Sequence, residues 1–76
     1  MKIAVLGAGS WGSAMAKHLS ERQHQVKVYV RKASQCRRLR ETRENPNYLP
    51  GVTLPVEIEF VDSLSSALED VQVVIG

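Results

Sequence analysis

Short apolar runs alternate with more polar segments along the whole of this 76-residue chain. Four runs that are either continuously apolar or alternate between apolar and polar residues predict β-strands, at residues 2–6, 25–30, 57–61 and 71–75. Three segments between them predict α-helices, at residues 10–22, 33–44 and 62–69. Ser13 falls on the solvent face of the first helix, and Asp62 or Ser63 can cap the third. Strands therefore alternate with helices from one end of the chain to the other.

This alternation is typical of a parallel sheet whose strands are joined by right-handed crossover helices. The predicted fold class is α/β, with strand order 3-2-1-4, the first half of a doubly wound, Rossmann-like nucleotide-binding fold. In the third strand acids alternate with Ile58 and Phe60, so this strand is expected at a sheet edge. The fourth strand would leave an apolar edge, which natural proteins avoid. We therefore expect residues 1–76 to be an N-terminal fragment of a dinucleotide-binding domain.

Two of the connections are unusual. All three prolines and one glycine lie between Asn45 and Pro55, which predicts a loop. The turn after the first helix contains no glycine, although helices commonly end on Gly or Asn in the left-handed conformation. If Gln23 takes this conformation, it costs about 1 kcal/mol relative to glycine.

The sequence GAGSWG, which begins at Gly7, matches G-x-G-x-x-G between a predicted strand and a predicted helix. This is the context that a dinucleotide-binding loop requires, although a plain strand-to-helix turn is the alternative. Gly7 permits a tight turn, Gly9 lets the backbone approach a pyrophosphate, and Gly12 lets the helix pack close to the sheet. Ser10 is expected to cap the helix or to donate to a phosphate. Trp11 is expected to shield the pyrophosphate or to pack against the loop.

A basic pair follows the second strand, where many dinucleotide-binding domains carry an acid. An acid about 20 residues beyond the glycine loop binds the adenine ribose of NAD, but no Asp or Glu occurs between Gln23 and Gln35. Arg31 and Lys32 stand there instead, and cations would attract the 2′-phosphate of NADP, Arg as a bidentate fork. The pair predicts NADP as the cofactor, with NAD also accepted; without a dinucleotide both would be ordinary surface cations.

Composition argues against several other classes. A net charge of +2 is too small to indicate nucleic-acid binding, and the arginines of the second helix alternate with acids. No apolar run approaches the roughly 20 residues of a membrane span. The single Cys36 forms no internal disulfide, so we expect a cytoplasmic protein. His18 and His24 have no metal-spaced partners, and no catalytic pair is visible.

Several segments resemble the start of bacterial NAD(P)-dependent glycerol-3-phosphate dehydrogenase: KIAVLGAGSWGSAMAKHL, VYVRK, RENPNYLPGVTLP and SALEDVQVVIG. The resemblance implies that the intact protein interconverts glycerol 3-phosphate and dihydroxyacetone phosphate, a step that supplies phospholipid precursors. Hydride would pass between the substrate C2 and the nicotinamide. The resemblance also implies cofactor contacts at Ser10, Trp11, Arg31, Lys32 and Tyr48. Tyr48 would reach the adenine end of the cofactor; its alternative role is to anchor the proline loop.

The resemblance further implies what the chain lacks. The family's catalytic lysines and its C-terminal substrate domain lie beyond residue 76, so no residue here is expected to be catalytic and the fragment alone is expected to be inactive. Lys17, Lys27 and Lys32 therefore receive no catalytic role.

Two alternative functions stay open. One is another NADP-linked reductase with the same first half, such as a hydroxyacid or pyrroline-carboxylate reductase. The other is a stand-alone nucleotide-sensing or interaction module, whose last edge a homodimer would cover.

Overall fold

The computed structural model describes all residues, 1–76, and all seven predicted elements form. The strands and helices are β1 (Lys2–Leu6), α1 (Ser10–Glu21), β2 (Gln25–Tyr29), α2 (Ala33–Thr42), β3 (Glu44–Asn45), β4 (Leu49–Thr53), β5 (Glu59–Val61), α3 (Leu64–Leu68) and β6 (Val73–Ile75). The predicted α/β class is therefore confirmed. No helix is both long and apolar enough to cross a membrane.

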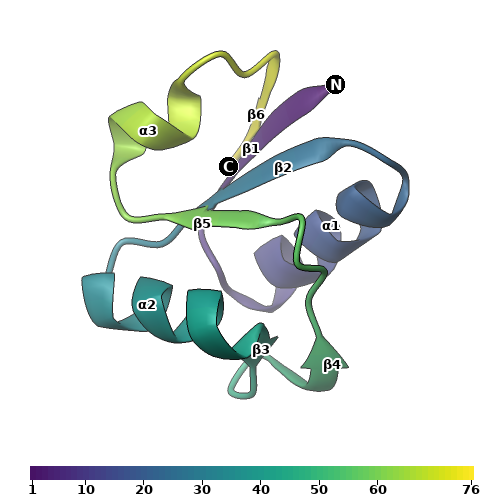
Figure 1. Cartoon of the computed structure of the whole chain (residues 1–76), viewed down its shortest axis with the longest axis vertical. Helices are drawn as coiled ribbons and strands as arrows, with labels where there is room; N and C mark the ends of the chain where they lie inside the picture. The colour runs from purple at the N-terminus through teal and green to yellow at the C-terminus, as the bar shows by residue number, and fades with distance from the viewer.

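The main sheet has four parallel strands in the order β5-β2-β1-β6, which is the predicted order 3-2-1-4. Val5 of β1 pairs with Val28 of β2 on one side and with Ile75 of β6 on the other. Helices α1 and α2 lie on one side of the sheet and α3 lies on the other (Figure 1). The carboxyl ends of β1 and β2 therefore meet at one edge of the sheet, beside the start of α1.

The core forms between the sheet and the two helices α1 and α2. Every second residue of β2 is buried, together with Val30 just beyond it, as the alternation predicts. Helix α1 contributes Ala16, and α2 contributes Cys36 and Leu39. Ile58 and Phe60 are buried while the acids beside them are exposed, so the prediction of a half-solvated edge strand is also confirmed. At the other edge Val74 is 48% exposed, which confirms the expected apolar edge.

The proline segment departs from the prediction of a simple loop. Strands β3 and β4 form a small antiparallel ribbon in which Glu44 pairs with Thr53. Pro50 lies within β4, where a two-stranded ribbon has room for a residue without an N–H. Gly51, with φ of 75°, supplies the left-handed position, and the buried Leu54 fixes the end of the segment in the core. The prediction failed because a two-residue strand carries no periodicity.

The helix ends show how local chemistry sets the boundaries. Gln23 does take a left-handed conformation, with φ of 72°, so the predicted strain at this turn is present. Helix α2 ends earlier than predicted because Arg43 turns left-handed with φ of 58°. Helix α3 is capped by Ser63, whose Oγ accepts from the Ser66 N–H at 3.4 Å, as one of the two predicted caps.

Candidate functional site

The glycine loop joins β1 to α1 with the geometry that its sequence predicts. Gly7 has φ of 116°, a conformation that side chains rarely adopt, and its N–H donates to the Tyr29 carbonyl at 3.0 Å. A Cβ on Gly12 would lie 2.3 Å from the Gly7 oxygen, so only glycine lets α1 start this close to the loop. A Cβ on Gly9 would meet no atom within 4 Å. The protein itself therefore does not require glycine at position 9, whereas it does at 7 and 12.

The start of α1 presents backbone donors to solvent. The N–H groups of Gly9, Ser10 and Trp11 have no acceptor within the chain, and the positive end of the helix dipole lies at the same place. The N-cap is Gly9, without a side-chain cap, so the prediction that Ser10 caps the helix is wrong. The Ser10 hydroxyl is exposed and makes no hydrogen bond in the chain. Trp11 is 58% exposed. The arrangement fits an anion.

A pocket of about 220 Å³ opens beside this loop, at the carboxyl edge of the sheet. Its lining brings together four residues that the sequence predicts to bind a cofactor: Gly7, Gly9, Arg31 and Tyr48. Ala8, Val30 and Gln35 complete it. Arg31 is exposed and its guanidinium makes no hydrogen bond within the chain. Segments about 40 residues apart thus converge on one cavity, which we call the carboxyl-edge pocket.

Lys32 is separated from this group. It is the N-cap residue of α2 and lines a neighbouring hollow of about 250 Å³ together with Tyr48. The two hollows share Tyr48 and Gln35, so they lie side by side. Arg31 therefore lines the same pocket as the glycine loop, while Lys32 lines the neighbouring hollow. The structure places Lys32 near the predicted site, outside the pocket itself.

Two polar residues that the sequence analysis missed lie beneath the loop. Ser13 was expected on the solvent face of α1, yet it is buried, because the segment that follows α2 covers that side of the helix. Asn45 is also buried, and its Nδ2 donates to the Ala8 carbonyl at 2.6 Å and to Ser13 Oγ at 2.9 Å. Ser13 Oγ in turn donates to the Ala8 carbonyl at 3.3 Å. A polar residue directly after Gly12 and an asparagine before Pro46 were the only signals in the sequence.

Two arginines of the supposed basic helix hold the fold together. The Arg40 Nε donates to the Phe60 carbonyl at 2.8 Å. The Arg43 guanidinium donates to the Ile58 carbonyl and lies 5.2 Å from the centre of the Phe60 ring. These cations are engaged with β5 and the chain before it.

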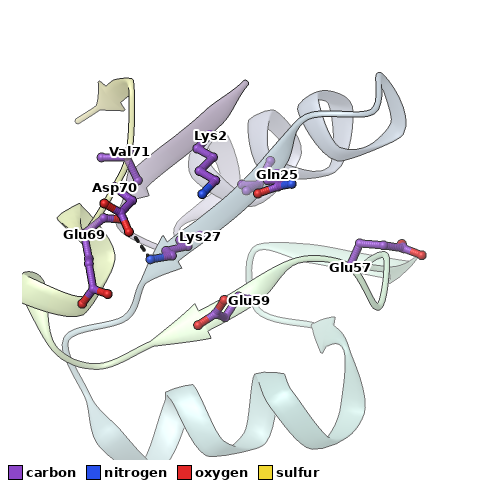
Figure 2. A pocket seen from close by; sticks show the side chains of 9 residues that line it. Lys2, Gln25, Lys27, Glu57, Glu59, Glu69, Asp70 and Val71 are labelled. Carbon is purple, nitrogen blue, oxygen red and sulfur yellow. Dashed lines mark hydrogen bonds between the residues drawn. The ribbon is translucent and has the colours of Figure 1, made fainter.

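A second, larger pocket of about 280 Å³ lies at the opposite, amino edge of the sheet (Figure 2). Its charged side chains are two lysines and four acids: Lys2, Lys27, Glu57, Glu59, Glu69 and Asp70. The Lys27 Nζ donates to the carbonyls of Ser66 and Glu69, at 3.0 and 3.1 Å, and so caps the end of α3. Two positive against four negative groups would repel a phosphate. Ligands of open parallel sheets bind at the carboxyl edge, so this pocket is not the candidate site.

Neither metal nor cysteine chemistry is indicated. No group of three or more His, Cys, Asp or Glu side chains is placed to hold a metal ion. Cys36 is buried in the core, and this burial raises the pKa of its thiol, with a smaller opposing effect of Arg40. The thiol therefore packs as a small apolar group. The backbone donors at the carboxyl edge suit an anion.

Comparison with known families identifies this architecture. The model of the family "NAD-dependent glycerol-3-phosphate dehydrogenase N-terminus" matches residues 2–76. The chain belongs to this family. The resemblance inferred from the four sequence segments is thus confirmed, and neither a different reductase nor a stand-alone module is favoured.

Named relatives and solved structures agree. The chain is 47% identical over 73 residues to the glycerol-3-phosphate dehydrogenase (NAD(P)+) of Geobacillus thermodenitrificans, and 46% identical over 70 residues to that of Neisseria meningitidis serogroup C. These matches cover 96% and 92% of this chain, and 21% of each relative. The crystal structure of glycerol-3-phosphate dehydrogenase from Coxiella burnetii superposes with a TM-score of 0.85 at 30% identity, over 97% of this chain and 24% of that one. The chain therefore spans about a fifth of the curated relatives it matches.

Proposed function

We propose that this chain is the N-terminal part of the dinucleotide-binding domain of an NAD(P)-dependent glycerol-3-phosphate dehydrogenase. The intact enzyme would interconvert glycerol 3-phosphate and dihydroxyacetone phosphate, a small phosphorylated substrate pair, and so supply phospholipid precursors. Family membership supports this activity, as do relatives whose names specify the reaction and the NAD(P)+ cofactor. A C-terminal substrate domain, absent from residues 1–76, would complete the enzyme.

The observation that carries the proposal is the convergence of Gly7, Gly9, Arg31 and Tyr48 on the carboxyl-edge pocket. The pyrophosphate of the cofactor would lie over the N-terminus of α1, where the N–H groups of Gly9, Ser10 and Trp11 have no acceptor in the chain. The absence of any neighbour around a Cβ on Gly9 fits a position kept clear for a ligand. The adenine ribose would lie toward Arg31, with Tyr48 beside it.

Within this chain the residues would bind and orient the cofactor and take no part in the chemical step. A bound nicotinamide ring would supply the hydride chemistry, which belongs to the cofactor. Two of the lysines are engaged elsewhere: Lys17 pairs with Glu21 at 2.7 Å on the surface of α1, and Lys27 caps α3. No residue of the chain is assigned a catalytic role. Residues 1–76 alone would be inactive.

The proposed preference for NADP depends on Arg31. A guanidinium at the end of β2 can hold the 2′-phosphate through paired N–H donors, whereas an acid there would repel it. Lys32 would add a long-range attraction from the neighbouring hollow. NAD, which lacks the phosphate, would still bind through the glycine loop, but less tightly.

Equilibrium binding of NADPH and NADH to the full-length protein tests this proposal. We expect Arg31→Asp to weaken NADPH binding about 10- to 100-fold, because it removes a charge-assisted contact and adds a repulsive one. NADH binding should change far less, so the preference reverses. Arg37→Asp is the matched control, since Arg37 is exposed on α2, lines neither hollow and makes no hydrogen bond. An unchanged NADPH-to-NADH ratio in Arg31→Asp would refute the assigned role.

Three further expectations stay predictions of this proposal. The cytoplasm is the expected location, consistent with a single buried, unpaired cysteine. Nucleic acid is not an expected partner, consistent with the arginines that contact β5. A homodimer is one way to cover the exposed β6 edge.

A further inference from the structure

We propose that Asn45 is a positioning residue for the cofactor, which holds the glycine loop in its phosphate-binding conformation and joins it to the segment that carries Tyr48. The inference rests on the proposed dinucleotide binding and extends it to residues that make no contact with the ligand. Its basis is the buried hydrogen-bonded triangle of Asn45, Ser13 and the Ala8 carbonyl.

The triangle is buried, and the chemistry of its three groups determines which of them donate and which accept. Asn45 is 5% exposed and Ser13 is 3% exposed, so neither side chain can exchange its partners for bulk water. The Ala8 oxygen can only accept, so the Asn45 amide must turn its NH₂ group toward it. One hydrogen of that group reaches Ala8 and the other reaches Ser13 Oγ, which donates its own hydrogen to Ala8. Each donor in the triangle therefore has an acceptor.

The peptide unit between Ala8 and Gly9 transmits this arrangement to the pocket. The chain contains no cis peptide bond, so the Ala8 C=O and the Gly9 N–H point in opposite directions across one rigid plane. When Asn45 holds the carbonyl on the buried side, the Gly9 N–H must point away from Asn45. That N–H has no acceptor in the chain. Asn45 thus fixes the orientation of a donor for the phosphate without touching the phosphate.

The backbone of Asn45 provides the second half of the connection. The Tyr48 N–H donates to the Asn45 carbonyl at 3.0 Å, so Asn45 is also the base of the turn that carries Tyr48. Tyr48 and the glycine loop line the same pocket. One residue therefore determines the spacing between the phosphate-binding side and the Tyr48 side. Displacing it should weaken every ligand that depends on the loop.

The test measures dissociation constants of the full-length protein for three probes: NADPH, NADH and adenosine 2′-monophosphate. The last carries the 2′-phosphate for Arg31 and has no pyrophosphate. We expect Asn45→Asp to weaken the binding of NADPH and of NADH by the same factor, about tenfold or more. The reason is that a carboxylate oxygen would repel the Ala8 carbonyl oxygen and could not donate to it. Binding of adenosine 2′-monophosphate should stay within about twofold of wild type. This pattern differs from Arg31→Asp, which changes the ratio of the two dinucleotides.

A pH profile separates positioning from simple damage to the fold. Burial raises the pKa of a carboxyl group, so an aspartate at this position would take up a proton at mildly acidic pH. The neutral acid again offers an O–H donor to Ala8. We therefore expect the deficit of Asn45→Asp, measured against wild type at each pH, to shrink as the pH falls. Asn45→Ala, which cannot regain a donor, should show a constant deficit.

Ser13→Ala keeps the test decisive if Asn45→Asp does not fold. It removes one donor to Ala8 and one acceptor of Asn45, so the loss should be smaller than in Asn45→Ala and not additive with it. Normal dinucleotide affinity in both Asn45→Ala and Ser13→Ala would overturn the inference. An equal loss of affinity for the dinucleotides and for adenosine 2′-monophosphate would overturn it as well. If wild type binds neither dinucleotide, the proposed function itself fails; if only the Asn45 result fails, that function stands.

Discussion

The amino and carboxyl ends of the parallel strands, which form the amino and carboxyl edges of the sheet, differ in whether their polar groups are paired within the chain. At the amino edge, the carbonyls at the end of α3 accept from Lys27, and the backbone N–H of Gln72 donates to the Lys2 carbonyl at 2.8 Å. At the carboxyl edge, the N–H groups of Gly9, Ser10 and Trp11 have no partner in the chain. The named backbone groups at the amino edge are paired within the chain, whereas those at the carboxyl edge are left for an outside acceptor.

This difference is more informative than cavity size. The amino-edge pocket is the larger of the two, at about 280 against 220 Å³. Lys27 there is already hydrogen-bonded, and the four acids of the pocket would repel an anion, so this pocket does not suit a phosphate. At the carboxyl edge, Arg31 and the helix start provide unpaired donors and positive potential. A candidate site in such a fold is therefore best recognised by the groups that the protein leaves unpaired.

The largest expected effect at the carboxyl edge comes from Gly12→Ala. The added Cβ would lie 2.3 Å from the Gly7 oxygen and 3.2 Å from its carbonyl carbon, both backbone atoms that cannot rotate away. We expect a loss of about 3 kcal/mol in stability together with a large loss of NADPH affinity, because the loop must move. Thermal unfolding and NADPH titration of the full-length protein measure both quantities. A variant with a wild-type unfolding midpoint and affinity would contradict the close packing of α1 on the loop.

Gly9→Ala adds the same methyl group three residues earlier, with a different expected result. No atom lies within 4 Å of the new Cβ, and Gly9 already has φ of −75°, which alanine adopts without strain. Stability should therefore be unchanged or slightly improved, while NADPH affinity falls about tenfold or more, because the methyl group would stand where the pyrophosphate approaches. The pair of variants separates a glycine required by the fold from one required by the ligand. Unchanged affinity in Gly9→Ala would place the pyrophosphate elsewhere.

Most of the fold could be predicted because its signals are local. A buried run such as Lys2–Leu6 and the alternation in Gln25–Tyr29 are recorded in consecutive residues, and strand order follows from the handedness of the crossovers. The ribbon of β3 and β4 was missed because it depends on contacts between distant residues. Leu54 anchors it in the core, and its N–H reaches the Arg43 carbonyl at 2.6 Å. Neither contact leaves a periodic pattern.

The candidate site was predictable only in part, for the same reason. Gly7, Arg31 and Tyr48 could be proposed one by one, and the structure brings them to one pocket. Ser13 was assigned to solvent because a helical wheel shows the side of α1 away from the sheet but not the chain segment that covers it. Asn45 was missed because a loop asparagine has many possible roles. Its partner at Ala8 lies 37 residues away.

The smallest expected effect is at the amino edge, and it tests whether that edge is only structural. Lys27→Met keeps the aliphatic stem but removes the ammonium that caps α3. The site is partly solvated, so we expect a local loss of about 1 kcal/mol, seen as roughly fivefold faster amide hydrogen exchange in Leu64–Leu68. NADPH affinity should not change, because Lys27 lies at the far edge of the sheet from the glycine loop. Lys17→Met, which removes only a surface pair with Glu21, is the matched control and should alter neither quantity measurably. A clear drop in NADPH affinity in Lys27→Met would show that the two edges are coupled, and the distinction drawn between them would then have to be abandoned.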